Sequence, residues 1–232
     1  MVSSGSSGGG MLVSPFRLRY RKDAELRFLG HLDTTRLLLR LLRRARLPLV
    51  FTAGFSPHPR IVGGPSLPLG FVSDVEFLDF ALRLDADAQP HDVASDVYER
   101  LCRAQEAQQI ILGMRALTEG EPRISRLAAT AKYALVFVDK DHRHTLTAQH
   151  VESWLADEAG ADGMSVDGQS RLPIGLISWK AKDGLLHLHA TVGGAKPLAL
   201  SRFVKRLAFF SGLRFLVGER KELMDAQGEP VR

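Results

Sequence analysis

The sequence has few of the residues on which several classes of protein depend. Its one cysteine, Cys102, excludes an internal disulfide framework and an iron–sulfur cluster held by this chain's own thiolates. Aromatic residues make up 7% of the chain, which disfavours an RNA-binding surface that stacks many bases. No apolar run reaches the roughly 18 residues that a membrane-spanning helix requires. These absences predict a cytoplasmic protein from a reducing compartment, with no membrane partner.

Length and composition favour two compact domains. A chain of 232 residues, of which 45% are hydrophobic, can bury the cores of two domains of about 100 residues each. The first residues, MVSSGSSGGGM, are rich in serine and glycine, and they lack the basic start and the apolar stretch of a signal peptide. We therefore interpret residues 1–14 as a flexible tail.

Positive charge is concentrated in one segment of the chain. The net charge is +5, but eleven lysines and arginines and only three acidic residues lie between Phe16 and Arg60, so this segment carries +8. A localised positive field is typical of a protein that binds a polyanion such as RNA. The alternative is a basic, solvated face without a ligand.

The first half of the chain follows the order strand, helix, strand, strand, helix, strand. Residues 16–22 alternate, with Phe16, Leu18 and Tyr20 on one face, which predicts a half-buried strand whose open face carries arginines. Asp33 is expected to cap a helix that runs to about Arg46. The remaining expected elements are a strand at 49–52, a loop at 53–73, a strand at 75–84, a helix from Pro90 and a strand at 110–117.

The second half repeats this order. Asp183 and Gly184 indicate a tight hairpin, and Gly212 is expected to end the last helix. The repeat predicts an α+β protein made of two tandem ferredoxin-like (βαββαβ) domains, each an antiparallel sheet with helices on one face. The expected parts are a first domain at 15–118, a linker at 119–131, a second domain at 132–222 and a flexible tail at 223–232. The expected elements of the second half are strands at 132–138, 174–181, 185–192 and 214–219 and helices at 147–159 and 201–211.

Several motifs of the first half resemble a known family. They are Arg19-Tyr20-Arg21-Lys22, GHLD at 30–33, Arg43-Arg44-Ala45, GFSPHPR at 54–60 and Pro65…Leu67-Pro68-Leu69-Gly70. On these residues the chain is similar to the uncharacterised radical-SAM-linked protein family, whose members are fused to radical-SAM proteins or encoded beside them. The resemblance covers residues 16–85 strongly and the remainder by pattern. It implies a separate radical-SAM protein as partner and a role in RNA metabolism.

The chain lacks the CxxxCxxC motif of a radical-SAM catalyst, since it has one cysteine. It is therefore expected to be a stand-alone accessory form, without a cofactor of its own.

Arginines are the expected contacts to RNA. Guanidinium groups stay charged and bind phosphate through paired hydrogen bonds, so they suit recognition of backbone and shape. Helical spacing places the arginines of the first helix on the face opposite its leucines. The predicted nucleic-acid-binding residues are Arg17, Arg19, Arg21, Arg27, Arg36, Arg40, Arg43, Arg44 and Arg60.

Two histidines are candidates for catalysis. His31 lies at the expected start of the first helix, and His58 lies between two prolines in the GFSPHPR segment. A histidine base beside arginines is the equipment that a metal-independent ribonuclease needs. The competing interpretation is that His31 only anchors the loop. No metal site is expected.

Three functions remain open at this point. The leading hypothesis is a non-catalytic RNA-binding accessory protein that presents structured RNA, tRNA or rRNA, to a radical-SAM partner for modification or processing. The first alternative is an endoribonuclease that uses His31 and His58. The second alternative is a protein–protein interaction module whose arginine face meets an acidic partner.

Overall fold

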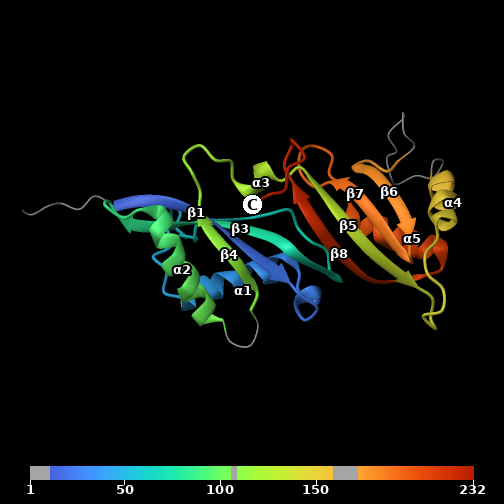
Figure 1. Ribbon diagram of the computed structural model, residues 1–232, viewed down its shortest axis with the longest axis horizontal. Coiled ribbons are helices and arrows are strands. Elements are labelled where there is room, and N and C mark those ends of the chain that lie inside the picture. The colour runs from blue at the N-terminus through green and yellow to red at the C-terminus, as the bar shows by residue number, and fades with distance from the viewer. Residues whose placement is uncertain (1–10, 106–108, 159–171) are drawn as a thin grey trace, which may run out of the picture.

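The computed structural model describes residues 11–105, 109–158 and 172–232, which form a mixed α+β structure around one eight-stranded sheet (Figure 1). The strand order is β4-β1-β3-β8-β5-β7-β6, and β2 pairs with a further part of β3. The strands are β1 (Met11–Lys22), β2 (Ile61–Gly63), β3 (Phe71–Asp85), β4 (Ile111–Ala116), β5 (Thr130–Val138), β6 (Leu176–Lys182), β7 (Leu185–Thr191) and β8 (Arg214–Met224). The helices are η1 (Leu26–Phe28), α1 (His31–Arg44), α2 (Pro90–Ala104), α3 (Ile124–Leu127), α4 (Ala148–Glu158) and α5 (Leu200–Ser211).

One continuous sheet replaces the two sheets expected from the sequence. Phe71–Ser73 of β3 pair in parallel with Gly218–Arg220 of β8, whereas the other strand pairs are antiparallel. Gly218 permits this junction, because a Cβ at that position would lie 2.3 Å from the ring of Phe71. The Phe71 ring stacks on Phe215 with 5.2 Å between centroids. The two halves of the chain therefore share backbone pairing and an aromatic contact.

The core of the first half forms between β1, β3 and the helices α1 and α2. The alternation predicted for β1 is confirmed on its inner face, where Phe16, Leu18 and Tyr20 are buried. They pack in one cluster with Leu38 and Leu42 of α1 and with residues of α2. The helix begins at His31 rather than at a cap on Asp33, because Gly30 is the N-cap and no side chain caps the helix.

The core of the second half lies under α4 and α5. Trp154 of α4 meets Phe203 of α5 edge to face, with 5.1 Å between ring centroids, and both side chains are fully buried. The predicted hairpin is confirmed, since Asp183 and Gly184 adopt left-handed φ values of 52° and 74° between β6 and β7. Gly212 ends α5 at φ 68°, as expected.

A buried ion pair joins the two halves. Arg220 of β8 donates from Nη1 to both carboxylate oxygens of Glu76 of β3, at 2.8 and 3.0 Å, and it also donates to the carbonyl oxygens of Pro65 and Ser66. The side chains of Arg220 and Glu76 are 1% and 5% exposed. Tyr20 and Tyr133 are buried beside this pair. The loss of water around their hydroxyl groups raises the pKa of both tyrosines.

Some expected boundaries are wrong. Residues 49–52 make only isolated bridges at Leu49 and Phe51, and the strand of this region is β2, inside the segment expected to be a loop. The first strand already begins at Met11, within the expected flexible tail, of which residues 1–10 lie outside the described part. The last strand extends to Met224, and Val231 donates its backbone N–H to Leu223 at 2.9 Å, so the described C-terminal residues return to the sheet. Among the described residues, no helix is both long and apolar enough to cross a membrane.

Candidate nucleic-acid interface

The outer face of α1 carries a row of arginines. Arg36, Arg40, Arg43 and Arg44 are exposed, as predicted, because the leucines between them turn toward β1 and β3. Arg36 also forms an exposed ion pair with Asp33, at 3.0 Å. An exposed pair of this kind contributes little stability, about 0–1 kcal/mol, so it does not hold Arg36 away from a ligand.

The end of α1 places an arginine in an unusual backbone conformation. The backbone N–H of Leu47 donates to the carbonyl oxygen of Leu42 and that of Arg46 donates to Arg43, the pattern of a Schellman motif. Arg46 has φ 54° in the left-handed region, where glycine is usual and an L-residue costs about 1–2 kcal/mol. A charged side chain therefore stands where backbone stability favours glycine.

A hollow of about 290 Å³ lies beside this helix end. Arg100 of α2 holds the end of α1 in place, because its Nη2 donates to the carbonyl oxygens of Ala45 and Arg46, at 2.8 and 2.6 Å. Four guanidinium groups border the hollow, which is lined by Arg44, Ala45, Arg46, Arg100, Arg103 and Ala104. Asp96 and Glu99 pair with Arg100 and Arg103. Guanidinium groups therefore border a space that a phosphate group can enter.

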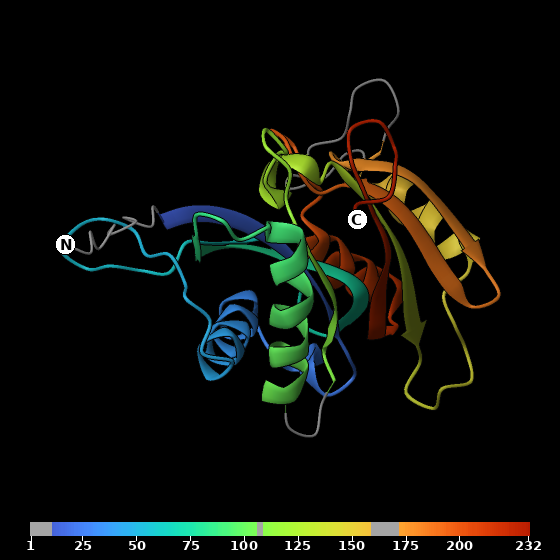
Figure 2. The ribbon, with the colours of Figure 1, turned by 60° about the vertical axis from the view of Figure 1, so that its left-hand side comes forward.

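An extended loop of residues 50–60, called the finger below, follows the end of α1 in the sequence. Residues 50–60 fold back on themselves, because Arg60 donates its N–H to Val50 at 2.7 Å and Thr52 donates its N–H to His58 at 2.8 Å. Figure 2 shows this segment projecting away from the sheet and helices. Residues 51–58 are exposed, and Phe55 at the tip is fully so. Val50 follows Arg46 by four positions, so the Cα atoms of the two residues lie within about 14 Å of each other.

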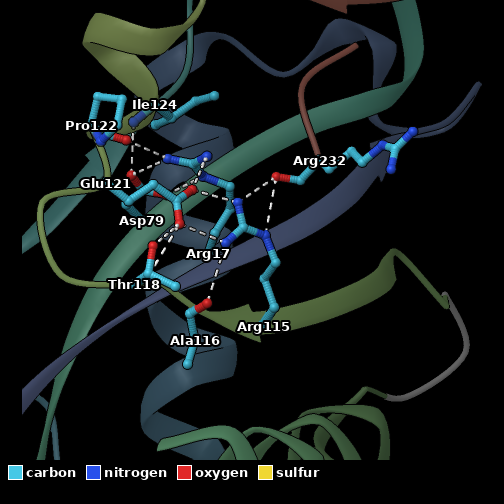
Figure 3. A network of polar contacts seen from close by, with 9 residues as sticks. All are labelled: Arg17, Asp79, Arg115, Ala116, Thr118, Glu121, Pro122, Ile124 and Arg232. Carbon is cyan, nitrogen blue, oxygen red and sulfur yellow. Dashed lines mark hydrogen bonds and ion pairs between the residues drawn. The ribbon is translucent and has the colours of Figure 1, made fainter. Parts of the chain in front are cut away.

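The strand arginines do not join this surface. Arg17 is 1% exposed rather than on an open face, and its Nε and Nη2 donate to Asp79 at 2.8 and 3.0 Å (Figure 3). The segment before α3 covers the pair, with Glu121 3.2 Å from Nη1 of Arg17 and the N–H of Ile124 donating to Asp79. The prediction that Arg17 faces solvent is wrong, and its guanidinium is unavailable to RNA.

Three further predicted arginines, Arg19, Arg21 and Arg27, make contacts outside the hollow. Arg19 is exposed and donates from Nε to the carbonyl oxygen of Asp74, while Arg21 is half-buried and lies 3.4 Å from the Asp74 carboxylate. Both belong to the face of β1 that turns away from α1 and α2. Arg27 stacks over the ring of Phe28 at 4.7 Å. Of the predicted set, Arg44 lines the hollow, Arg36, Arg40 and Arg43 lie on the outer face of α1, and Arg60 lies at the base of the finger.

The two candidate histidines occupy different surroundings. His31 is exposed, and its ring lies against β2, since a Cβ at Gly63 would be 3.2 Å from its Cε1. His58 belongs to the finger, and its backbone N–H donates to Oγ1 of Thr52. No contact between the two is found in the described part of the chain. Within the same residues, no group of three or more His, Cys, Asp or Glu side chains could hold a metal ion.

Three site residues escaped the sequence analysis. Arg46, Arg100 and Arg103 line the hollow, but Arg100 and Arg103 lie in the second helix, more than 50 residues from Arg46. Periodicity assigns residues to the faces of one helix and does not pair the ends of two helices. The sequence did contain one signal, Arg46 itself. A basic residue stands just after the end of the helix, at the position where glycine is usual.

Comparison with known families gives one result. A family model described as an uncharacterized protein conserved in bacteria, DUF2344, matches residues 16–171, more than half of the chain. No curated protein matches. The matched span includes α1, the finger and both sides of the hollow, and the description states neither an activity nor a partner.

Proposed function

Since the chain belongs to the bacterial family DUF2344, for which no activity is described, we propose that it is an RNA-binding accessory protein, acting with a radical-SAM partner in the modification or processing of tRNA or rRNA. It would work in the cytoplasm. The arginine hollow at the ends of α1 and α2 is the observation that supports this function. Guanidinium groups on two rigid helices suit the phosphate backbone of a structured RNA.

The strained backbone at Arg46 strengthens the proposal. A residue that breaks a local stability rule and lies in a charged hollow is typical of a functional position. The exposed arginines of α1 continue the positive surface from the hollow, and Arg60 adds a charge at the base of the finger. Phe55 at the finger tip could pack on a base or on the partner.

The architecture fits tandem ferredoxin-like units, which we propose as the arrangement of the fold. The first half has the order β4-β1-β3 with β2 also on β3, and the second has β8-β5-β7-β6. In each half, the first and third strands of the βαββαβ order are neighbours in the sheet, and the second and fourth strands flank them. The parallel contact between β3 and β8 would join the units into one platform for RNA.

An apolar hollow favours the alternative of a protein interaction module. It has a volume of about 380 Å³ and lies between the loop before β3 and the helix α5, with Leu69, Phe71, Val204, Ala208 and Phe215 among its lining residues. Leu69, which lines the hollow, is 59% exposed, and Phe209, next to the lining residue Ala208 on α5, is 91% exposed. Exposed apolar side chains around a hollow are typical of a protein contact. This surface could serve the radical-SAM partner whether or not RNA binds.

Binding to total tRNA and to a duplex DNA, measured by fluorescence polarisation over a salt series, tests the proposal. We expect tighter binding to tRNA, with an affinity that falls steeply with salt. Charge reversal of Arg36, Arg40 and Arg43 should lower the salt slope by about three, because each lost phosphate contact removes about one. Reversal of the exposed Arg126, Lys140 and Arg143 is a control with the same change in net charge.

The outcomes separate the hypotheses. Equal loss of affinity in both triple variants would mean a non-specific effect of charge, and absence of tRNA binding at low salt would refute the RNA-binding function. A stable complex with the radical-SAM protein that resists ribonuclease would then support the interaction module. Cleavage of RNA in EDTA that is lost on His31→Ala or His58→Ala would instead support the endoribonuclease.

A further inference from the structure

The loop before β3 presents a leucine to solvent from a fixed position. Lys22 is buried and donates from Nζ to the carbonyl oxygen of Pro68 at 3.3 Å. On the other side of Leu69, the backbone N–H of Gly70 donates to the carbonyl oxygen of Arg27 at 2.8 Å. Leu69 is 59% exposed between these two attachments and lines the apolar hollow of about 380 Å³. This wall of the hollow is therefore preorganised, which lowers the entropy cost of binding a partner.

The opposite wall of the hollow is one row of side chains on α5. Ser201 and Lys205 line the hollow, and Phe209 continues the row, because residues four apart are neighbours on a helix surface. Phe209 is 91% exposed. Lys205 is also exposed, and within the described residues its ammonium group makes no hydrogen bond or ion pair. An exposed apolar side chain and an unpaired cation therefore stand together on this wall.

The charge around this wall has one sign. The residues of α5 include Arg202, Lys205 and Arg206 and no acidic residue, and Arg214 follows at the start of β8. From Gly184 to Val217 the sequence has five lysines and arginines and no aspartate or glutamate. A second copy of the chain, docked on itself through this surface, would bring like charges together, which is unfavourable. An acidic partner is complementary to this surface.

The lining of the hollow favours a protein segment over an RNA backbone. Apart from Ser201 and Lys205, the lining residues are apolar, so the hollow offers a chain of phosphates a single cation. A large apolar side chain that fills a pocket inside a polar rim is the usual centre of a protein–protein contact. Such an anchor in the hollow would lie between Leu69 and Phe209, and a carboxylate beside it can pair with Lys205.

We propose that this hollow receives a large apolar side chain from an acidic segment of a partner protein, and that Lys205 pairs with a carboxylate of the same segment. Leu69 from the loop and Phe209 from α5 flank the inserted side chain. This contact rests on the protein-contact role proposed above for the hollow, and it does not depend on RNA binding at α1.

A phage-displayed library of random peptides of about twelve residues tests this contact on the full chain. Selection should enrich peptides in which Leu, Phe, Trp or Met lies next to Asp or Glu. A fluorescein-labelled synthetic copy of the most enriched peptide then reports affinity by polarisation. Leu69→Ala combined with Phe209→Ala should lower this affinity by about tenfold or more, and Lys205→Glu should lower it by about fivefold or more.

Two exposed residues of β6 provide matched controls. Ile177→Ala removes an apolar side chain and Lys180→Glu reverses a charge, and neither residue lines the hollow. Each control should change the affinity for the peptide by less than about twofold. Thermal unfolding of every variant shows whether it remains folded.

Three results would overturn the proposal. The first is a selection that enriches no peptide, or a peptide whose affinity is unchanged in the Leu69 and Phe209 double variant. The second is an unchanged affinity in Lys205→Glu, which would refute the acidic partner. The third is a dimer in analytical ultracentrifugation that the double variant abolishes, which would assign the hollow to a second copy of the chain.

The RNA-binding function fails or survives separately from this contact. Charge reversal of Arg36, Arg40 and Arg43 should weaken tRNA binding and leave the affinity for the peptide unchanged. The Leu69 and Phe209 double variant should do the opposite. A double variant that weakens tRNA binding but not peptide binding would assign the hollow to RNA and overturn the protein contact.

Discussion

Arg17 of β1 and Asp79 of β3 face each other as a two-point ion pair, with Nε 2.8 Å from Oδ1 and Nη2 3.0 Å from Oδ2. Neither side chain is more than 1% exposed. Asp79 also accepts the backbone N–H of Ile124 at 2.7 Å, and Arg17 donates to the carbonyl oxygen of Pro122. The pair therefore fixes the segment that links the two halves onto the sheet (Figure 3).

Arg17→Ala should destabilise the protein strongly. The variant leaves the carboxylate of Asp79 buried without its counter-ion, which typically costs about 3–5 kcal/mol. Urea unfolding followed by circular dichroism measures the change. Arg19→Ala, on the same strand but exposed, should cost less than about 1 kcal/mol. Similar losses in both variants would show that the ion pair contributes nothing beyond an ordinary surface arginine.

This relationship marks the limit of prediction from the sequence. Alternation correctly assigned Phe16, Leu18 and Tyr20 to the core, because period-two burial is a local property of a strand. The same pattern wrongly predicted that Arg17 faces solvent. The residues that cover Arg17, Glu121 and Pro122, lie about 100 residues later in the sequence.

Long-range packing also explains the other differences. The element order of both halves was predictable from periodicity and turn residues, whereas the single sheet depends on the contact of Phe71 with Gly218. The arginine row of α1 was predictable from helical spacing. The hollow was not, because Arg100 reaches the end of α1 from another helix.

Arg220→Ala should weaken the junction between the halves. It removes the buried partner of Glu76 and the contacts to the loop before β3, so we expect a loss of about 3–5 kcal/mol. Both tryptophans, Trp154 and Trp179, lie in the second half, so their fluorescence reports that half while circular dichroism reports both. In the variant the two signals should give different urea midpoints. Coincident midpoints would mean that the halves still unfold together without this pair.

Glu121 should contribute stability that is lost in acid. Hydrogen bonds from Arg115, one of them 2.9 Å long, lower the pKa of Glu121 from its ordinary value of 4.5 to about 2. Because the folded pKa is the lower one, the stabilisation is complete above pH 4.5 and disappears as the pH falls toward 2. Glu121→Gln should therefore flatten the decline of the unfolding free energy in this range. An unchanged decline would assign the acid sensitivity to other carboxylates.

Arg46→Gly should separate stability from RNA binding. Glycine removes a left-handed strain of about 1–2 kcal/mol but adds about 0.5–1 kcal/mol of unfolded-state entropy, so the unfolding free energy should rise by about 0.5–1 kcal/mol. If Arg46 contacts a phosphate, the same variant should bind tRNA more weakly, with a salt slope reduced by about one. Arg46→Lys retains both the charge and the strain, so it should change neither the salt slope nor the stability appreciably. A stabilised Arg46→Gly variant with unchanged tRNA affinity and slope would exclude Arg46 from the interface, and the strain in the hollow would then have no role in binding RNA.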